Sequence, residues 1–465
     1  MKLIKKMLLV ISVLFIAINA MADIALPSLI GDNMVLQQNT KVKIWGWSDP
    51  AEVIAITPSW SNRTDTITAD HNAKWAVYIN TPKAGGPYSI TISGSGGHKL
   101  VLQNIMVGEV WFCSGQSNME ASYNYLGIKE VGRDALVGNN PNIRFCKVRK
   151  TTANYPQDNC MTKWEVCDST SIREISAVAY YFARKLNKDL NVPIGIIQSA
   201  WGGTAIEPWI SADIIKSNPI YKASSEMQKA YPWWPCEPGS AYNAMVAPVT
   251  HYTIAGAIWY QGESNTAFPS AYRSLLSTMI AEWRKDWNKE FPFYYVQIAP
   301  FKNYAKDSAA FLREAQIQCL TNKNAGMVVV SDLVDNVTDI HPQNKHDVGY
   351  RLANLALFKT YNQANIAWKC PTYQKMEINQ NKLIVYFDSD IMIAGKKVDE
   401  LFIAGADKVF YPANATVEGN KLIVSGKKVK APASVRYSFS NQAIGNLFSV
   451  EKLPVSPFRT DNWSK

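Results

Sequence analysis

The middle of this chain alternates short apolar runs with helical patterns, and this rhythm constrains the fold more than any other feature. Five apolar runs have the length of buried strands: residues 107–112, 193–198, 255–260, 293–298 and 327–330. In two of the segments between them, residues 175–186 and 275–283, apolar residues fall on one face at helical spacing. Strands that alternate with helices predict an α/β fold with a mostly parallel sheet.

The two flanks of this region have a different pattern. In residues 23–106, apolar residues recur at every second position, as in Val42 with Ile44 and Val53 with Ala55, and glycine-rich turns separate the runs, which predicts a small β-sandwich. β patterns return after about residue 366, where the pentamer Asn-Lys-Leu-Ile-Val starts at Asn381 and again at Asn420 and indicates two hairpin strands. We therefore expect an N-terminal β-sandwich domain at 23–106, an α/β domain at 107–365 and a C-terminal β-rich region at 366–465.

Two segments interrupt the alternation of strands and helices, residues 132–168 and 219–239, and we expect both to leave the sheet. The second contains the aromatic sequence Tyr-Pro-Trp-Trp-Pro at residues 231–235. Loops at the carboxyl ends of parallel strands carry the binding site in such folds. The aromatic loop therefore either walls a pocket or fills the space beneath a long connection.

The first 22 residues have the pattern of a secretory signal peptide. Three lysines precede an apolar stretch from Met7 to about Ile18, and small residues at Ala20 and Ala22 suit a cleavage site. The alternative, a membrane anchor, needs about 20 apolar residues to span a bilayer. We expect the mature chain to begin near Asp23 and to be exported, either to the periplasm or to the medium.

Composition excludes several classes of partner. The formal net charge is +10 over 465 residues, three of the lysines lie in the first 22, and no dense basic cluster interleaved with aromatic residues occurs, so nucleic-acid binding is not expected. Seven cysteines are an odd number for an exported chain, so at least one is free or pairs with another chain. The five histidines are scattered and the cysteine spacings do not fit a zinc site, so we expect no metal and no cofactor.

A candidate nucleophile follows the first run of the α/β region. Gly115-Gln116-Ser117-Asn118-Met119-Glu120 places Ser117 just past a buried strand and a glycine, at the carboxyl edge of the sheet. There a hydroxyl faces a ligand, and the following backbone N–H groups can bind an oxyanion. Taken alone, a Gly-x-Ser sequence is more often a turn whose hydroxyl caps a helix.

A serine nucleophile needs a base, and His341 is the best placed of the five histidines. It lies in Thr-Asp-Ile-His-Pro after the last predicted strand, at the same sheet edge as Ser117. Asp339 is the nearest acid that could orient the imidazole, although residues two apart in an extended strand point to opposite faces, so this pairing requires a turn. Asp332, Asp335, a water molecule or a backbone carbonyl remain alternatives.

Two more segments follow strands at this edge. Trp201-Gly202-Gly203-Thr204 leads to Glu207, and Tyr260-Gln261-Gly262-Glu263 leads to Asn265. Glycine lets the backbone approach a reacting carbonyl, and a side-chain amide adds a donor for the oxyanion, each donor being worth roughly 100- to 1000-fold in rate. Four such elements at one edge predict a hydrolase site.

The series Gly-Gln-Ser-Asn-Met, Trp-Gly-Gly-Thr, Trp-Tyr-Gln-Gly-Glu-Ser-Asn and Asp-Ile-His-Pro resembles the SGNH hydrolase superfamily, and more closely its sialate O-acetylesterase family. The resemblance covers nearly the whole chain after residue 22. It implies a flavodoxin-like SGNH hydrolase domain with a mostly parallel sheet, flanked by N-terminal and C-terminal β-sandwich-like regions. The chain departs from the superfamily where Gln261 replaces the usual asparagine and where Thr338 stands in place of the acid of Asp-x-x-His.

Carried over by motif, the resemblance implies roles for individual residues. Ser117 would be the nucleophile and His341 the base, with Asp339 as the orienting acid. The oxyanion hole would comprise the Ser117 amide, Gly202 or Gly203, and the Gln261 side chain. Substrate contacts would come from residues of the same blocks: Gln116, Trp201, Glu207, Tyr260, Glu263 and Asn265.

The sequence thus predicts an exported serine esterase that removes O-acetyl groups from sugars through an acyl-enzyme. Its expected partner is an O-acetylated carbohydrate, most simply an acetylated sialic acid. Stacking of Trp201, Trp209 and Tyr260 on the sugar is one hypothesis, and their burial in the core is the other. The alternatives for the whole chain are an acetyl esterase acting on xylan or another plant polysaccharide, and a non-catalytic carbohydrate-binding protein.

Overall fold

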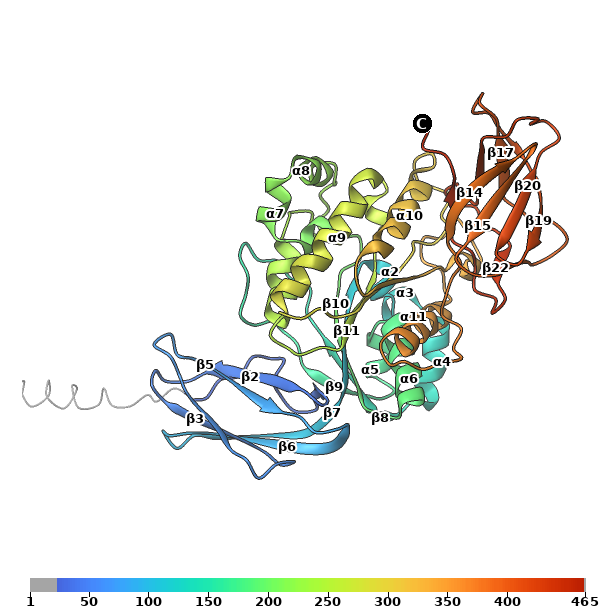
Figure 1. Cartoon of the computed structure of the whole chain (residues 1–465). Coiled ribbons are helices and arrows are strands. Elements are labelled where there is room, and N and C mark those ends of the chain that lie inside the picture. The colour runs from blue at the N-terminus through green and yellow to red at the C-terminus, as the bar shows by residue number, and fades with distance from the viewer. Residues whose placement is uncertain (1–22, 464–465) are drawn as a thin grey trace, which may run out of the picture.

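The five predicted runs form five parallel strands at the centre of the molecule (Figure 1). The computed structural model describes residues 23–463, so the predicted signal segment lies outside the described residues. The strands lie in the order β10-β7-β11-β12-β13, and their bounds are β7 (Lys99–Gly115), β10 (Ile194–Ala200), β11 (Gly256–Tyr260), β12 (Phe293–Val296) and β13 (Ala325–Val328). Every residue of the last four strands is buried, as expected for a parallel sheet covered on both faces.

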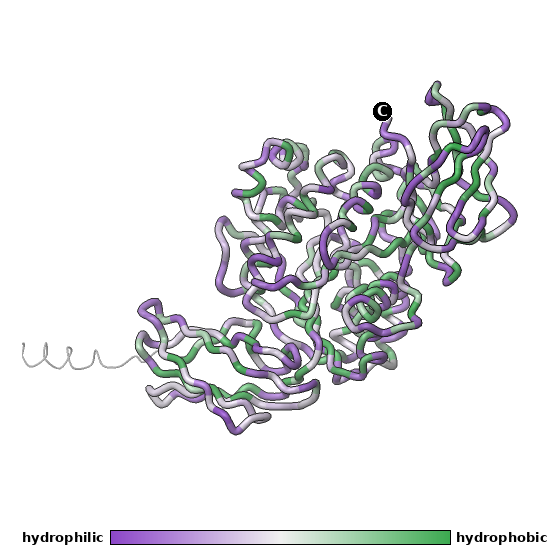
Figure 2. The backbone as a smooth tube through the Cα atoms, in the orientation of Figure 1, coloured by the Kyte–Doolittle hydropathy of each residue, from purple (hydrophilic) through white to green (hydrophobic). Residues whose placement is uncertain are grey.

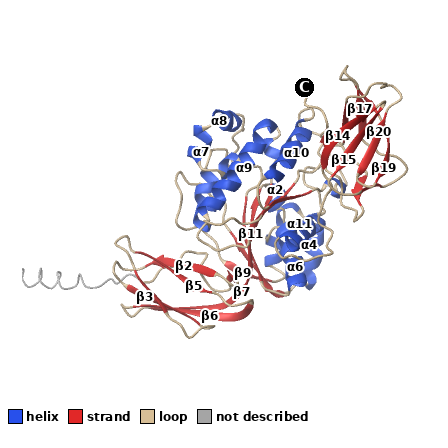
Figure 3. Cartoon of the chain, viewed as in Figure 1, coloured by secondary structure: helices blue, strands red, loops and turns tan. Residues whose placement is uncertain are grey.

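Helices cover the two faces of this sheet (Figure 3). Helices α6 (Ala177–Leu190) and α11 (Lys345–Lys359) pack on one face, where Trp111 and Ile258 share a core with them. Helices α9 (Pro269–Asp286) and α10 (Ser308–Gln318) pack on the other, where Phe112 and Trp259 are buried. Both helical patterns predicted from the sequence are confirmed in α6 and α9.

Shorter helices fill the connections. They are α2 (Ser117–Glu120), α3 (Tyr123–Leu126), α4 (Lys129–Val137), α5 (Ser171–Glu174), α7 (Ala212–Ser217), α8 (Pro219–Glu226) and the one-turn helices η1 (Glu207–Trp209), η2 (Tyr242–Val246), η3 (Ala247–Val249), η4 (Glu263–Asn265), η5 (Cys319–Thr321) and η6 (Ser331–Leu333). Hydrophobic stretches follow the strands at the centre, whereas many loops and outer helical turns are hydrophilic (Figure 2).

One of the two predicted excursions from the sheet is wrong. Residues 132–168 contain β8 (Asn140–Lys147), which pairs parallel with β10, and β9 (Trp164–Cys167), which pairs antiparallel with β8. The start of β8 is polar and the buried Arg144 lies within it, donating to the Asn104 side chain, so the strand lacks a continuous apolar run. Residues 219–239 form α8 and an irregular loop that stays off the sheet, as predicted.

In the described residues, the N-terminal region contains six strands, and one long strand, β7, runs from this region into the central sheet. The six are β1 (Val35–Gln37), β2 (Lys41–Trp47), β3 (Val53–Pro58), β4 (Asp65–Thr68), β5 (Lys74–Asn80) and β6 (Gly85–Gly94). β7 pairs with β6 in its first part and with β10 and β11 in its second, so the expected boundary at residue 106 falls inside a continuous strand. The prediction that Val53 and Ala55 form the apolar face of β3 is wrong. Ile54 and Ile56 are buried, whereas Val53 is 42% exposed.

The C-terminal region consists of short strands: β14 (Tyr373–Asn379), β15 (Lys382–Phe387), β16 (Ile391–Ile393), β17 (Leu401–Ala404), β18 (Phe410–Pro412), β19 (Asn414–Glu418), β20 (Lys421–Ser425), β21 (Ser434–Tyr437), β22 (Leu447–Ser449) and β23 (Phe458–Arg459). The repeated pentamer forms β15 and β20, which pair antiparallel with each other. Both belong to hairpins, as predicted, and each is the second strand of its hairpin.

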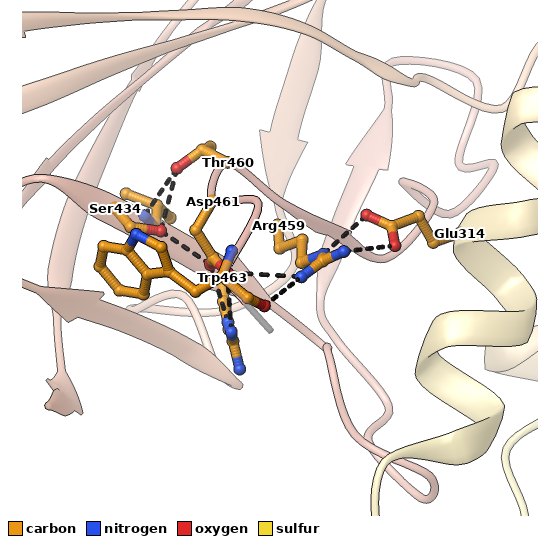
Figure 4. Close-up of polar contacts among 8 residues, drawn as sticks. Glu314, Ser434, Arg459, Thr460, Asp461 and Trp463 are labelled. Atoms are coloured by element: carbon orange, nitrogen blue, oxygen red, sulfur yellow. Dashed lines mark hydrogen bonds and ion pairs between the residues drawn. The ribbon is translucent and has the colours of Figure 1, made fainter. Parts of the chain in front are cut away.

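Ion pairs tie this region to helix α10 (Figure 4). The Arg459 guanidinium donates to both carboxylate oxygens of Glu314, at 2.8 and 3.0 Å, and also contacts Asp461. Asp461, whose side chain is almost fully buried, is also paired with Arg436.

The division of the chain into separate domains stays a prediction.

All seven cysteines are free, and six of them are buried. Among residues 23–463, no helix combines the length and the apolar character that crossing a membrane requires.

Candidate active site

A pocket of about 520 Å³ opens at the carboxyl ends of β7, β10 and β11. Four of the sequence blocks singled out above contribute to its wall, through Ser117, Gly203, Glu263 and His341. The aromatic loop closes one side with Trp233 and Trp234, which confirms the prediction that this loop walls a pocket.

Ser117 and His341 are in direct contact across the pocket. The Ser117 Oγ lies 2.9 Å from the His341 Nε2, although the two residues are 224 positions apart in the sequence. Gly115 makes this position possible, since its φ is +142° and a Cβ there would lie 2.2 Å from the Tyr260 carbonyl oxygen. The strand therefore turns at Gly115 and delivers Ser117 to the first position of α2.

The surroundings of His341 favour a neutral imidazole. Burial lowers the pKa of His341, the positive charge of Lys345 lowers it further, and Asp339 acts in the opposite direction. A neutral imidazole has a free lone pair on Nε2, which can accept the hydroxyl proton of Ser117.

Asp339 contacts His341 through the backbone. Its Oδ1 accepts a hydrogen bond of 2.8 Å from the His341 N–H, and within residues 23–463 no bond joins its carboxylate to the imidazole. The turn that a pairing of Asp339 with His341 requires is therefore present. In this turn, Asp339 contacts the main chain of His341 and not its imidazole. Asp332, one of the alternative acids, forms a two-pronged ion pair with Arg351 at 2.6 and 2.7 Å.

The Gly202-Gly203 loop is held by an acid from the nucleophile block. The Glu120 Oε2 accepts a hydrogen bond of 2.7 Å from the Gly202 N–H, and its Oε1 pairs with the Lys150 ammonium at 2.7 Å. Gly203 has a φ of +85°, and a Cβ there would lie 2.3 Å from the Trp234 ring. In the described residues, no acceptor pairs with the N–H groups of Gly203 and Ser117.

The Gln261 side chain lies behind the pocket wall. Its Nε2 donates to the Asn265 Oδ1 at 2.7 Å and to the Thr204 carbonyl at 3.3 Å, and it is fully buried. Asn265 in turn donates to both carboxylate oxygens of Glu207, and burial raises the pKa of this carboxyl group. Three residues expected at the oxyanion or at the substrate therefore form a buried network that supports the loops.

Asn118 connects three parts of the site. Its Nδ2 donates to the Glu263 Oε1 at 2.6 Å and to the Ile340 carbonyl at 3.0 Å, and its Oδ1 accepts from the Lys345 Nζ at 2.7 Å. Burial raises the pKa of Glu263 and lowers that of Lys345 to about 7. Ile340 precedes His341 and Asn118 follows Ser117, so these hydrogen bonds link the loop of His341 to the segment of Ser117.

The remaining predicted contacts divide into two groups. Gln116 and Glu263 line the pocket, and the Gln116 Oε1 also accepts from the Gly262 and Ser264 N–H groups at 3.3 Å. Tyr260 and Trp209 are buried in the core, so the core interpretation holds for both. Trp201 is partly buried and donates from its indole N–H to the Trp233 carbonyl at 2.8 Å.

Sequence reasoning missed several residues of this site. Lys150 and Tyr125 line the pocket from segments without any motif, so no signal could have found them. Glu120 and Lys345 stand inside or next to the motif blocks, and a charge so close to a motif was a usable signal. Helix α11 begins at Lys345, with the Asn344 side chain capping it.

The chain is similar to known proteins. A family model described as carbohydrate esterase, sialic acid-specific acetylesterase, matches residues 107–357, which is more than half of the chain. The chain belongs to this family. It is therefore a carboxylic ester hydrolase, and the predicted resemblance is confirmed.

Individual relatives extend the similarity beyond the matched segment. The sialate O-acetylesterases of Homo sapiens and Pongo abelii are each 28% identical over 393 residues, which cover 76% of this chain and 74% of the relative. A crystal structure of a carbohydrate acetylesterase from Xanthomonas citri is 36% identical, covers 95% of this chain and 100% of that chain, and superposes with a TM-score of 0.85.

Proposed function

We propose that this chain is an exported serine esterase of the SGNH type, which removes O-acetyl groups from sugars with Ser117 as nucleophile and His341 as base. The contact of 2.9 Å between the Ser117 Oγ and the His341 Nε2, at the wall of a pocket, carries this proposal. The strand order also supports it: numbered among themselves, the five buried strands β10-β7-β11-β12-β13 have the 2-1-3-4-5 order of flavodoxin-like folds, and β8 extends the sheet beyond β10.

The first half of the reaction forms an acetyl-enzyme. The Ser117 Oγ attacks the acetyl carbonyl carbon while its proton passes to the His341 Nε2. The tetrahedral intermediate then collapses, the bond to the sugar oxygen breaks, and the imidazolium returns the proton to that oxygen. In the second half, His341 takes a proton from water, the water oxygen attacks the acetyl group, and acetate leaves with Ser117 restored.

The oxyanion of each intermediate needs hydrogen-bond donors. The N–H groups of Ser117 and Gly203 are the donors we assign, because both belong to pocket-lining residues and neither is paired within residues 23–463. Gly202 is held by Glu120, and Gln261 is engaged by Thr204 and Asn265, so these two residues position the loop.

Asp339 stabilises the imidazolium by charge at the moment it forms. Its carboxylate raises the pKa of His341, in opposition to burial and to Lys345. Its bond to the His341 N–H keeps the loop in place. We therefore assign Ser117 and His341 to proton and acyl transfer, and Asp339 to orientation and charge.

The substrate class follows from the relatives. The curated relatives are named sialate O-acetylesterases, so a 9-O-acetylated sialic acid is the first substrate to test, and the bacterial structure is named a carbohydrate acetylesterase. Acetylated xylan is the alternative. The pocket-lining cation Lys150 is already paired with Glu120, so charge alone does not select an acidic sugar.

The test is acetate release by the full chain from 9-O-acetylated N-acetylneuraminic acid and, in parallel, from acetylated xylan. Ser117→Ala and His341→Gln should each lower kcat by about four to six orders of magnitude. His346→Gln is the matched control, because His346 pairs with Asp347, does not line the pocket, and should retain activity.

The outcomes separate chemistry from substrate. Release from sialic acid that disappears in Ser117→Ala supports both. Release from xylan alone keeps the mechanism and changes the substrate. No release from either ester contradicts the mechanism and favours a carbohydrate-binding protein. Release that persists in Ser117→Ala contradicts the assignment of Ser117 as nucleophile.

A further inference from the structure

The outward face of the β2–β5 ribbon carries an unusual number of aromatic residues. The two strands pair antiparallel with Lys43 opposite Tyr78, Trp45 opposite Ala76 and Trp47 opposite Lys74. Directly opposed residues project to the same side of a sheet, so these six side chains share one face. The other face carries Val42, Ile44, Val77 and Ile79, which are buried in the core.

Segments distant in the sequence build walls above this face. A pocket of about 200 Å³ is bounded by Trp45, Trp47 and Trp75, by His251 from the turn before β11, and by Asp158 from the β8–β9 connection. A second hollow of about 140 Å³ continues along Lys43, Tyr78 and His251. The two share Lys43 and His251, so they form one groove between the ribbon and the α/β region, which we call the ribbon groove.

The ribbon groove offers both ring faces and polar groups. Trp47 is partly exposed, Tyr78 is 60% exposed, and the indole N–H of Trp45 is buried without a partner among residues 23–463. The imidazole of His251 lies edge-on to Trp45, with ring centres 5.6 Å apart. Buried donors without acceptors are rare in folded proteins, so the unpaired Trp45 N–H marks this face as unusual.

The charges in the ribbon groove are balanced. Lys74 pairs with Asp158 at 2.6 Å, and Lys43 stands over the Trp45 ring at 6.0 Å. Asp70 already accepts from the N–H groups of Asn72 and Lys74. Paired charges next to aromatic rings suit hydroxyl groups, which donate and accept, and balanced charges give no net attraction for an anionic ligand.

We propose that the ribbon groove is a second carbohydrate-binding site, distinct from the hydrolytic pocket, which takes neutral pyranose units of an oligosaccharide. None of its lining residues lines the pocket of Ser117. Such a site would hold an unacetylated part of a polymeric substrate while the ester group is hydrolysed elsewhere. The binding itself does not depend on the proposed catalytic mechanism.

The test is direct binding of unacetylated xylohexaose, cellohexaose and mannohexaose to the full chain, measured by calorimetry. We expect at least one of them to bind with a Kd of roughly 0.1 to 1 mM. Trp47→Ala and Tyr78→Ala should each weaken that binding about tenfold or more. Tyr78 is exposed and its removal leaves the core intact, so this variant keeps the test informative if Trp47→Ala unfolds.

Trp233→Ala is the matched control, because it removes an exposed aromatic residue from the hydrolytic pocket and should leave hexasaccharide binding unchanged. Hydrolysis of p-nitrophenyl acetate by Tyr78→Ala should equal that of the wild type. Binding that is lost in Trp233→Ala and retained in Tyr78→Ala would overturn the proposal. So would the absence of binding up to about 10 mM for all three sugars, or binding of 3′-sialyllactose only.

Discussion

Among the residues of the site, Lys345 is unusual because its charged group is buried. It is fully buried, its ammonium lies 5.6 Å from the centre of the Tyr260 ring and donates to Asn118, and burial lowers its pKa to about 7. Below that pH it carries a positive charge close to His341. That charge opposes the protonation of the imidazole, so under the proposed mechanism Lys345 would extend activity toward acid.

We predict that Lys345→Met moves the acid limb of the kcat/KM profile to higher pH. Protonation of His341 abolishes its function as a base, and loss of the neighbouring cation raises the pKa of His341. Asp339→Asn should move the limb in the opposite direction. Lys150→Met, which removes a cation that has no effect on the pKa of His341, is the control and should leave the limb in place. An unmoved limb in Lys345→Met would contradict the electrostatic role.

The position of the loop after β10 depends on a hydrogen bond to helix α2. Glu120, from α2, accepts the Gly202 N–H and thereby fixes the neighbouring Gly203, whose N–H we assign to the oxyanion. Lys150 pairs with the same carboxylate. The glycine loop therefore takes its position from the nucleophile block.

We predict that Glu120→Ala lowers kcat by about 100-fold with little change in KM, because misplacing a donor by about 1 Å has an effect of this size. Glu120→Gln keeps an oxygen acceptor for Gly202 and should lose less. Steady-state kinetics on the acetylated substrate gives both constants. A rise in KM with an unchanged kcat would show instead that Glu120 serves binding.

Much of the fold could be predicted at the level of elements. The five central strands were visible because each is buried on both faces and reads as a continuous apolar run. β8 was missed since its polar start and Arg144 break that run, and its pairing with β10 is a tertiary property. In β3 both faces carry apolar residues, so alternation alone could not decide that Ile54 and Ile56 point inward.

The candidate site was predictable only in part. Motifs identified Ser117 and His341, but Gln261 and Asn265 form hydrogen bonds with each other, and no spacing rule shows where an amide points. Lys150 approaches Glu120 from 30 residues along the chain, in a segment without a motif. Such contacts depend on the packing of loops, which the local sequence does not encode.

At the scale of the whole molecule, the C-terminal strands are fastened to the α/β region by polar contacts. The buried Arg313 of α10 donates to the Ser440 and Asn441 carbonyls. The Arg459 guanidinium donates to the Glu314 carboxylate, also on α10. The last described residues thus lie beside α10 (Figure 4). Asp461 is central to this contact because it pairs with both Arg436 and Arg459.

We predict that Asp461→Asn destabilises the folded chain by about 3 kcal/mol at pH 7, since it leaves two arginines without their buried partner. Burial alone would raise the pKa of Asp461, but hydrogen bonds from Arg436 and Ser434 outweigh it and hold the pKa below its usual value. The stabilisation is therefore complete above the unfolded-state pKa of about 3.9 and is lost as the pH falls through the lower folded-state pKa.

Urea unfolding at several pH values measures this contribution. The midpoint of Asp461→Asn should lie below that of the wild type at pH 7, and the two should converge as the pH falls below about 4. Asp399→Asn is the matched control, because Asp399 is half-exposed and lies 3.9 Å from Lys397 at the surface, where an ion pair contributes little. Equal midpoints for Asp461→Asn and the wild type at pH 7 would show that apolar packing, and not this ion-pair cluster, holds the C-terminal strands against α10.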